Sequence, residues 1–158
     1  MKRSTLTRGL IVAATLLVLG AVNLGIAAKE RIKRSGEVVL LALAPVDPRS
    51  LMQGDYMALR FALADQITAD ESGFAPLTVD EHGVATLDTA NNPGALRIRY
   101  RIRANRVWLG TNAYFFEENR AGNFALARFG EFHVDRSSGE AVLTGLRDAQ
   151  FRPLGAAR

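Results

Sequence analysis

Residues 9–28 form an uncharged, apolar segment that constrains the fold more than any other feature of the chain. The segment, GLIVAATLLVLGAVNLGIAA, has 20 residues, and its polar side chains are Thr15 and Asn23. A helix of this length rises about 1.5 Å per residue, so it measures roughly 30 Å, the thickness of the hydrocarbon core of a bilayer. The sequence therefore predicts a transmembrane anchor at residues 9–28, with the lipid bilayer as its first partner.

A cleaved signal peptide is the alternative interpretation of this segment. Basic residues precede it, and Gly25-Ile26-Ala27 has the small-x-small pattern of a cleavage site. The apolar core of a signal peptide usually has about 7–15 residues, and this segment is longer. Its length favours an uncleaved anchor.

The charges that flank the apolar segment are nearly balanced. Three basic residues lie within residues 1–8, and four lie within residues 29–34. The positive-inside rule is therefore weak here. The free amino group and Glu30 shift the balance toward an N-terminus, residues 1–8, on the cytoplasmic side.

The domain that follows the anchor is close to neutral. The formal charge of the chain is +4, but residues 29–158 hold 17 basic and 16 acidic residues, a net charge of +1. With one Trp in the chain, this domain lacks the general electrostatic footprint of a nucleic-acid-binding protein. The chain has no Cys, so neither disulfides nor thiol chemistry is available.

Turn signals recur every 8–12 residues after the anchor, which is typical of a β-rich domain. We expect a mainly β fold, a small antiparallel sheet or partly open barrel with one or two short helices. The expected parts are a linker or helix continuation at 29–36, the β domain at 37–152 and a tail at 153–158. The expected strands lie at 38–44, 55–63, 77–79, 84–88, 95–104, 107–109, 112–116, 130–135 and 140–146. A hairpin loop is expected at 80–83, a helical turn or loop within 64–74, and a helix at 119–128.

Residues 45–61, PVDPRSLMQGDYMALRF, are dense in conformational signals. Asp47 can cap a helical turn, Pro48 suits its first position, and Gly54 can end it in the left-handed conformation. From residue 55 onward, polar and apolar side chains alternate as in a half-buried strand. The pattern predicts a turn and a strand register, and no particular chemistry.

The same stretch carries a family resemblance. Gly54-Asp55-Tyr56-x-x-Leu59-x-Phe61 resembles the box that names the GDYXXLXY family of bacterial membrane-anchored proteins, with Phe61 in place of the final Tyr. The similarity continues through residues 45–49, 113–118, 127–135 and 145–148, and spans roughly 29–150. It implies a periplasmic domain on a single-pass protein of the inner membrane, and no established activity.

The resemblance also implies the kind of partner. Members of this family resemble accessory subunits of polytopic membrane proteins, so we expect a non-enzymatic protein whose domain binds such a partner. The candidate binding residues belong to the motif boxes that carry the resemblance: Asp47, Pro48, Arg49, Gly54, Asp55, Tyr56, Leu59, Tyr114, Phe116 and Glu117.

The segment Tyr114-Phe115-Phe116 is expected to be a strand in which Phe115 points to one side and its two neighbours to the other. Two interpretations remain. The strand is buried on both sides, or one set of rings forms a ridge that binds a partner.

Arginine alternates with apolar residues along the strand expected at 95–104. Arg97, Arg99, Arg101 and Arg103 would share one face, with about 6.6–7 Å between successive residues. Such a face can bind an anionic polymer or lipid phosphates. Pairing with carboxylates on neighbouring strands, for example Glu117, Glu131 or Asp135, is the simpler explanation, and we favour it.

A membrane-anchored hydrolase is the competing function. The pattern around Leu51 and Gly54-Asp55 is similar to the box after the nucleophile of type I signal peptidases, but the position of their Ser falls near Val46. A hydrolase on this chain would use Ser50 or Asp55. Type I signal peptidases need a Lys base, and here Lys occurs at positions 2, 29 and 33 alone. His82 and His133 lack a second His at ligand spacing, so we expect no metal and no cofactor.

Overall fold

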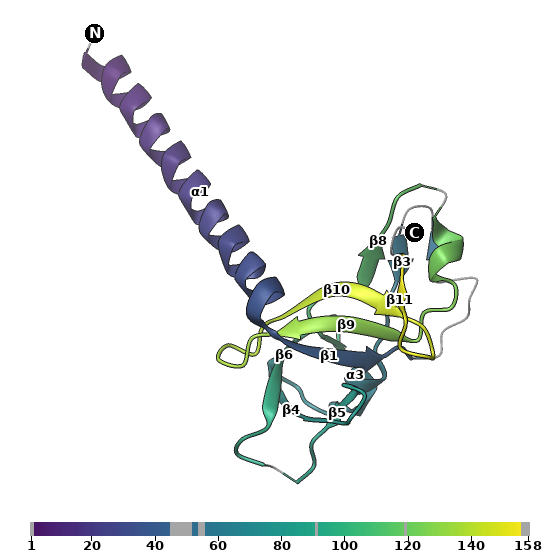
Figure 1. Cartoon of the computed structure of the whole chain (residues 1–158). Helices are drawn as coiled ribbons and strands as arrows, with labels where there is room; N and C mark the ends of the chain where they lie inside the picture. The colour runs from purple at the N-terminus through teal and green to yellow at the C-terminus, as the bar shows by residue number, and fades with distance from the viewer. Residues whose placement is uncertain (1, 45–51, 54–55, 91, 119, 156–158) are drawn as a thin grey trace.

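The computed structural model describes residues 2–44, 52–53, 56–90, 92–118 and 120–155 (Figure 1). A long helix, α1 (Lys2–Ser35), precedes a β domain. Its part from Thr7 to Ser35 is long and apolar enough to cross a membrane. Thr15 and Asn23 each donate a side-chain hydrogen bond to the carbonyl oxygen four residues earlier, so their polar groups are satisfied inside the helix.

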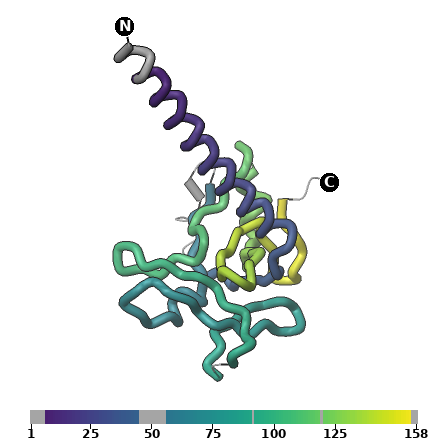
Figure 2. Tube along the Cα trace, turned by 90° about the vertical axis from the view of Figure 1, so that its left-hand side faces the viewer, coloured from purple at the N-terminus to yellow at the C-terminus, as the bar shows by residue number. Residues whose placement is uncertain are grey.

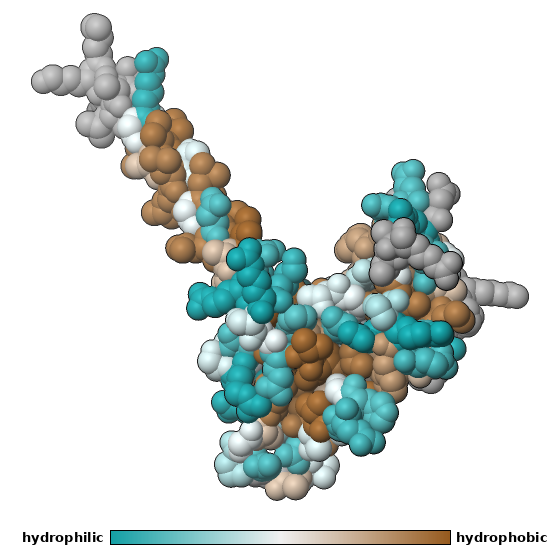
Figure 3. Space-filling view, in the orientation of Figure 1, coloured by the Kyte–Doolittle hydropathy of each residue, from teal (hydrophilic) through white to brown (hydrophobic). Residues whose placement is uncertain are grey.

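The polar residues after the apolar segment continue α1 as far as the domain. Ile32 is 5% exposed and packs against the domain, and the helix ends where the N–H of Gly36 donates to the carbonyl oxygen of Ile32. A Cβ at Gly36 would lie 2.6 Å from that oxygen and 3.1 Å from Cβ of His133, so the junction requires glycine. Figure 3 shows the apolar part of α1 standing clear of the domain between hydrophilic ends.

The sheet nearest to α1 has the order β1-β9-β10-β11, and all its pairings are antiparallel. Its strands are β1 (Glu37–Ala42), β9 (Phe129–Val134), β10 (Ala141–Arg147) and β11 (Pro153–Leu154). Burial alternates along β9, with Phe132 and Val134 fully buried. Because β11 pairs with the end of β10, this sheet extends past residue 152.

The second sheet has the order β5-β4-β6-β7. Its strands are β4 (Gly73–Val79), β5 (Ala85–Leu87), β6 (Leu96–Arg103) and β7 (Arg106–Trp108). The loop between β4 and β5 turns as expected, with Gly83 at φ +81° and its N–H bonded to the carbonyl oxygen of Asp80. A parallel bridge between Leu40 and Val84 joins this sheet to β1.

The third sheet is small and has the order β2-β3-β8. It comprises β2 (Met52–Gln53), β3 (Tyr56–Ala58) and β8 (Ala113–Phe115). A short helix, α3 (Ala62–Gln66), and a 3₁₀ helix (Ala121–Phe124) complete the described elements.

All three sheets contribute to one hydrophobic core. At its centre, the rings of Phe61 and Phe132 meet edge to face, with 5.1 Å between their centroids. The predicted fold class, a mainly β domain of curled sheets with short helices behind an apolar N-terminal helix, is confirmed. The strands expected around the hairpin loop at 80–83, along 95–104 and in the terminal hairpin are also present.

The predicted helix at 119–128 is wrong, because a single 3₁₀ turn, Ala121–Phe124, occupies this region. Gly122 lies at its centre, and glycine costs about 1 kcal/mol in a helix relative to alanine. Packing of Phe124, which is 4% exposed, determines the conformation of the segment.

The predicted strand at 55–63 is too long, because β3 spans Tyr56–Ala58 and α3 follows at Ala62. The expected alternation nevertheless holds: Met57, Leu59 and Phe61 are buried. Met52–Gln53 is a strand that pairs with β3 in the register Gln53↔Tyr56, and the helical turn predicted before it lies outside the described residues. Gly54 itself and the predicted cap at Asp47 lie outside the described residues.

Candidate functional site

One end of the domain is rich in aromatic side chains. We call the sheet β2-β3-β8 together with the 3₁₀ helix the aromatic lobe. Figures 1 and 2 show that the lobe rises from the β9–β10 layer on the same side as α1. A surface on this lobe is therefore directed toward the side on which the anchor leaves the domain.

The interior of the lobe is a cluster of three rings. The ring of Phe124 meets the ring of Tyr114 at 61° and that of Phe116 at 25°, each with 5.2 Å between centroids. Phe124 is buried, and the other two are half-buried against it. Two of the predicted binding residues, Tyr114 and Phe116, thus contribute mainly to the packing of the lobe.

Phe115 points the other way and is the exposed ring. It is 74% exposed, stands opposite Tyr56 in the β3–β8 register, and has its ring centroid 5.8 Å from that of Tyr56. The expectation that Phe115 and its neighbours face opposite sides is correct, and the interpretation of a strand buried on both sides is wrong. The outer face of the lobe therefore presents an aromatic pair, and Leu126, 65% exposed, follows the 3₁₀ helix.

The other predicted binding residues have different surroundings. Leu59 is 6% exposed and belongs to the core, while Glu117 forms an exposed ion pair with Arg120 at 2.9 Å. Asp47, Pro48, Arg49, Gly54 and Asp55 lie outside the described residues, as does Ser50.

The four arginines of β6 share one exposed face, as predicted. The guanidinium of Arg97 lies over the ring of Phe74, 5.5 Å from its centroid, and that of Arg103 lies over the ring of Trp108 at 5.7 Å. Arg99 forms an ion pair with Glu140 at 3.7 Å. For Arg101 the described part of the chain offers no ion pair.

The carboxylates predicted to pair with these arginines are the wrong ones. Glu117 pairs with Arg120, and Glu131 pairs with Arg147. Asp135 instead accepts hydrogen bonds within its own turn, from Ser137 and Ser138, which lower its pKa to about 2. Cross-strand register decides these partners, and it cannot be read from one strand alone.

A cleft of about 460 Å³ lies between the domain end of α1 and the exposed face of β6 and β7. We call it the basic cleft. Its lining residues are Gly25, Ala28, Lys29, Arg99, Arg101, Arg103, Trp108, Gly110, Glu140 and Ala141. The hydrogen bond from Lys29 and the nearby guanidinium groups keep the pKa of Glu140 below its usual value. Sequence reasoning missed this site, because Lys29 and Glu140 are 111 positions apart and no local pattern connects them.

The segment 145–148, which is part of the family resemblance, ends in a turn that Asp148 stabilises. The carboxylate of Asp148, 5% exposed, accepts from the N–H groups of Gln150 and Arg152 and from the guanidinium of Arg152. Burial raises the pKa of Asp148, but these hydrogen bonds together outweigh it, so the pKa is lowered. The turn places Phe151, at φ +60°, against Phe129.

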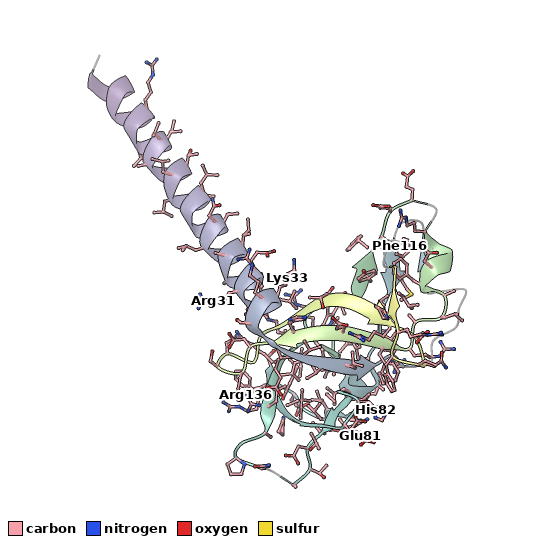
Figure 4. All side chains as sticks on the ribbon, viewed as in Figure 1. Arg31, Lys33, Glu81, His82, Phe116 and Arg136 are labelled. Atoms are coloured by element: carbon pink, nitrogen blue, oxygen red, sulfur yellow. The ribbon has the colours of Figure 1, made fainter. Side chains whose placement is uncertain are left out.

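The two histidines lie on different elements, His82 on the β4–β5 loop and His133 on β9. His82 lies away from α1, with its ring 5.0 Å from that of Phe151 (Figure 4). His133 Nε2 lies 3.9 Å from Glu131 Oε1, and its Nδ1 is buried with no hydrogen-bond partner among the described residues. Among the described residues, no three His, Cys, Asp or Glu side chains gather in a way that could hold a metal ion.

A second cleft, of about 470 Å³, lies between α3 and the segment 105–112. Its charged groups include the ion pair between Arg60 and Asp65 at 2.9 Å. The described residues that line it include Thr111 and Asp65, and no Ser, Cys, His or Lys.

Comparison with known protein families identifies a match that covers most of the chain. The family model described as GDYXXLXY protein matches residues 18–146, which covers the end of α1 and the domain through most of β10. No match to this chain was found among the curated proteins or among the solved structures.

Proposed function

This chain belongs to the GDYXXLXY family, and from that premise we propose that it is a non-enzymatic, membrane-anchored accessory protein whose β domain binds a partner protein. In this proposal α1 spans the inner membrane once and is not cleaved. Residues 1–8 lie in the cytoplasm and the domain in the periplasm. The partner is a polytopic membrane protein.

The exposed aromatic pair on the lobe is the observation that supports partner binding. Phe115 leaves 74% of its surface exposed, beside the ring of Tyr56. Large aromatic side chains are enriched at protein interfaces and often dominate their binding energy. The lobe rises on the same side as α1, so a partner that contacts it can also have a part within the membrane (Figures 1 and 2).

Site-specific cross-linking in intact cells tests this surface. A photoreactive phenylalanine analogue is placed at Phe115 or, as the control, at Phe74. Phe74 is 51% exposed and lies in β4 of the sheet β5-β4-β6-β7. We expect position 115 to cross-link to an integral membrane protein and position 74 not to. Phe115→Ala should then weaken co-purification of that protein by tenfold or more, the effect of an interface hot spot. Equal cross-linking at both positions, or unchanged co-purification, would refute the proposal.

The topology has its own test. A reporter enzyme that is active only outside the cytoplasm, fused after Arg158, should be active. Activity of a cytoplasm-only reporter at the same junction would show that the protein has the opposite orientation, with its domain in the cytoplasm. The mass of the mature protein shows whether the chain is cleaved near Ala27.

A hydrolase would use Ser50 or Asp55, and alanine variants at these positions separate the two functions. If partner binding persists and a hydrolytic activity of the purified chain disappears in either variant, the non-enzymatic proposal is wrong. If the proposal is correct, the purified chain shows only background hydrolysis, and neither variant changes it.

A further inference from the structure

The basic cleft lies where the apolar part of α1 gives way to its polar end. Gly25, Ala28 and Lys29 line it, and they share one face of the helix because they are three and four residues apart. A side chain added at Gly25 would meet nothing within 4 Å, so the wall formed by the helix is open. One wall of the cleft thus belongs to the membrane helix, and the other belongs to the domain.

The charges in the cleft do not balance. Four cations line it, Lys29 and the arginines at 99, 101 and 103, against the single carboxylate of Glu140. That carboxylate already accepts a hydrogen bond from Lys29 and pairs with Arg99. Arg101 and Arg103 form no ion pair within the described part of the chain, and although the charge of Arg101 also acts on Glu140, the cleft keeps an excess of positive charge. Guanidinium groups bind phosphate with two parallel hydrogen bonds.

Trp108 adds a feature typical of a membrane surface. It pairs with Arg101 in the register of β6 and β7, and its ring lies under the guanidinium of Arg103. Trp is enriched at the boundary between hydrocarbon and water. The volume of about 460 Å³ is within the range of roughly 300–1,000 Å³ found for small-ligand sites.

We propose that the basic cleft binds the phosphate of an anionic phospholipid at the surface of the bilayer. Arg101 and Arg103 hold the phosphate, and the acyl chains lie along the face of α1 that bears Gly25 and Ala28. The inference rests on the membrane span in the proposed function. A free phosphate has the same charge, but the helix wall favours the lipid, because free phosphate gains nothing from an apolar wall.

Trp108 is the one Trp of the chain, so the Trp fluorescence of the protein reports lipid bound in the basic cleft. The full-length protein in mixed micelles is titrated with brominated phosphatidylglycerol, which is anionic, or with brominated phosphatidylcholine, which is zwitterionic. Bromine quenches indole fluorescence at short range, so quenching reports lipid in the cleft. We expect half-maximal quenching at a several-fold lower mole fraction of the anionic lipid.

Arg101→Gln should remove most of this preference. A basic residue near an anionic membrane contributes about 1 kcal/mol, which corresponds to about a fivefold change in binding. Arg101→Lys should restore most of the loss, because the positive charge returns. Arg97→Gln is the matched control: this residue lies on the same face of β6 but does not line the cleft. It should leave the preference unchanged.

Three results would overturn the proposal. The first is equal quenching by the two lipids, or an unchanged preference in Arg101→Gln. The second is recovery of fluorescence on addition of inorganic phosphate at constant ionic strength, which would identify free phosphate as the occupant. The third is loss of the cross-linked partner in Arg101→Gln while lipid preference persists, which would assign the cleft to an acidic surface of that protein.

The result of the lipid titration does not depend on partner binding. The titration uses purified protein without a partner, and Phe115→Ala should retain the lipid preference. Failure of the lipid test therefore leaves the role of the aromatic lobe unaffected, and failure of the Phe115 cross-linking leaves the lipid test valid.

Discussion

Gly130 should be intolerant of even a single added methyl group. It lies in β9, opposite Leu41 on one side and Leu146 on the other. A Cβ at this position would lie 2.8 Å from Cε1 of Phe61, 3.1 Å from Cδ1 of Leu143 and 3.2 Å from Cε2 of Phe132. Phe61 and Phe132 are buried and pack against each other, so their rings have little room to move.

Two opposing terms set the magnitude for Gly130→Ala. Inserting a methyl group into a packed core costs about 1–3 kcal/mol. Replacing Gly reduces the entropy of the unfolded chain and returns about 0.4–1 kcal/mol. The net loss is about 1–2 kcal/mol. For a domain of about 120 residues, the unfolding entropy converts this loss to roughly 4–8 °C in the melting temperature.

Unfolding of the full-length protein in detergent, followed by the fluorescence of Trp108, measures this loss. Gly145→Ala is the matched control, because Gly145 lies in the neighbouring strand β10 and an added Cβ would meet nothing within 4 Å. That variant should be as stable as the original chain or slightly more stable. Phe61→Leu combined with Gly130→Ala should destabilise by about 1 kcal/mol less than the sum of the single changes, since the smaller side chain relieves the contact.

Two outcomes would contradict the expected clash at Gly130. If Gly130→Ala melts at or above the original temperature, the sheet adjusts freely and the core is not tightly packed at this point. If Gly145→Ala loses as much stability as Gly130→Ala, the loss reflects strand conformation instead of contact with Phe61.

Three further outcomes follow from single contacts. Phe132→Ala should cost about 3–5 kcal/mol in urea unfolding, because Phe132 is fully buried and the substitution leaves a cavity; a cost below about 1 kcal/mol would contradict this. Hydrogen bonds from Ser137 and Ser138 lower the pKa of Asp135 to about 2, so its contribution to stability is present above the pKa of an unfolded Asp, about 3.9, and is lost as the pH falls toward 2. NMR titration should show this low pKa, and Asp135→Asn should remove the acid-dependent step. The hydrogen bond from Lys29 lowers the pKa of Glu140, so Lys29→Met should raise that pKa in the same titration while changing the free energy of unfolding by less than about 1 kcal/mol, since both side chains are partly exposed.

The features predicted correctly from sequence are those that depend on local periodicity. Alternation along 96–103 identified β6 and its arginine face, and the position of Gly83 identified the β4–β5 loop. The length of the apolar segment identified the long helix α1. Each of these patterns is complete within about 20 residues, so no distant contact is needed to recognise it.

The errors arise where distant contacts override local preference. The segment at 119–128 has several helix-forming residues, but Phe124 packs between Tyr114 and Phe116 in a single 3₁₀ turn. The arginine partners were misassigned because the order β5-β4-β6-β7 keeps Glu131 in another sheet. The basic cleft could not be predicted at all, because it requires Lys29 of α1 to meet Glu140, the residue immediately before β10.

The described part of the GDY box, residues 56–61, determines which side chains of this segment face the core. Met57, Leu59 and Phe61 point into the core, and this spacing orients Tyr56 toward the opposite face. Tyr56 then pairs across the strands with Phe115, the ring that is most exposed in the lobe. If one residue were inserted between Tyr56 and Leu59, the strand faces would be exchanged and the aromatic pair would be lost. The core positions of the box therefore determine which ring is exposed on the lobe. Under the proposed function, variants at Leu59 and Phe61 should reduce partner binding only to the extent that they destabilise the domain, whereas Phe115→Ala should reduce it without loss of stability.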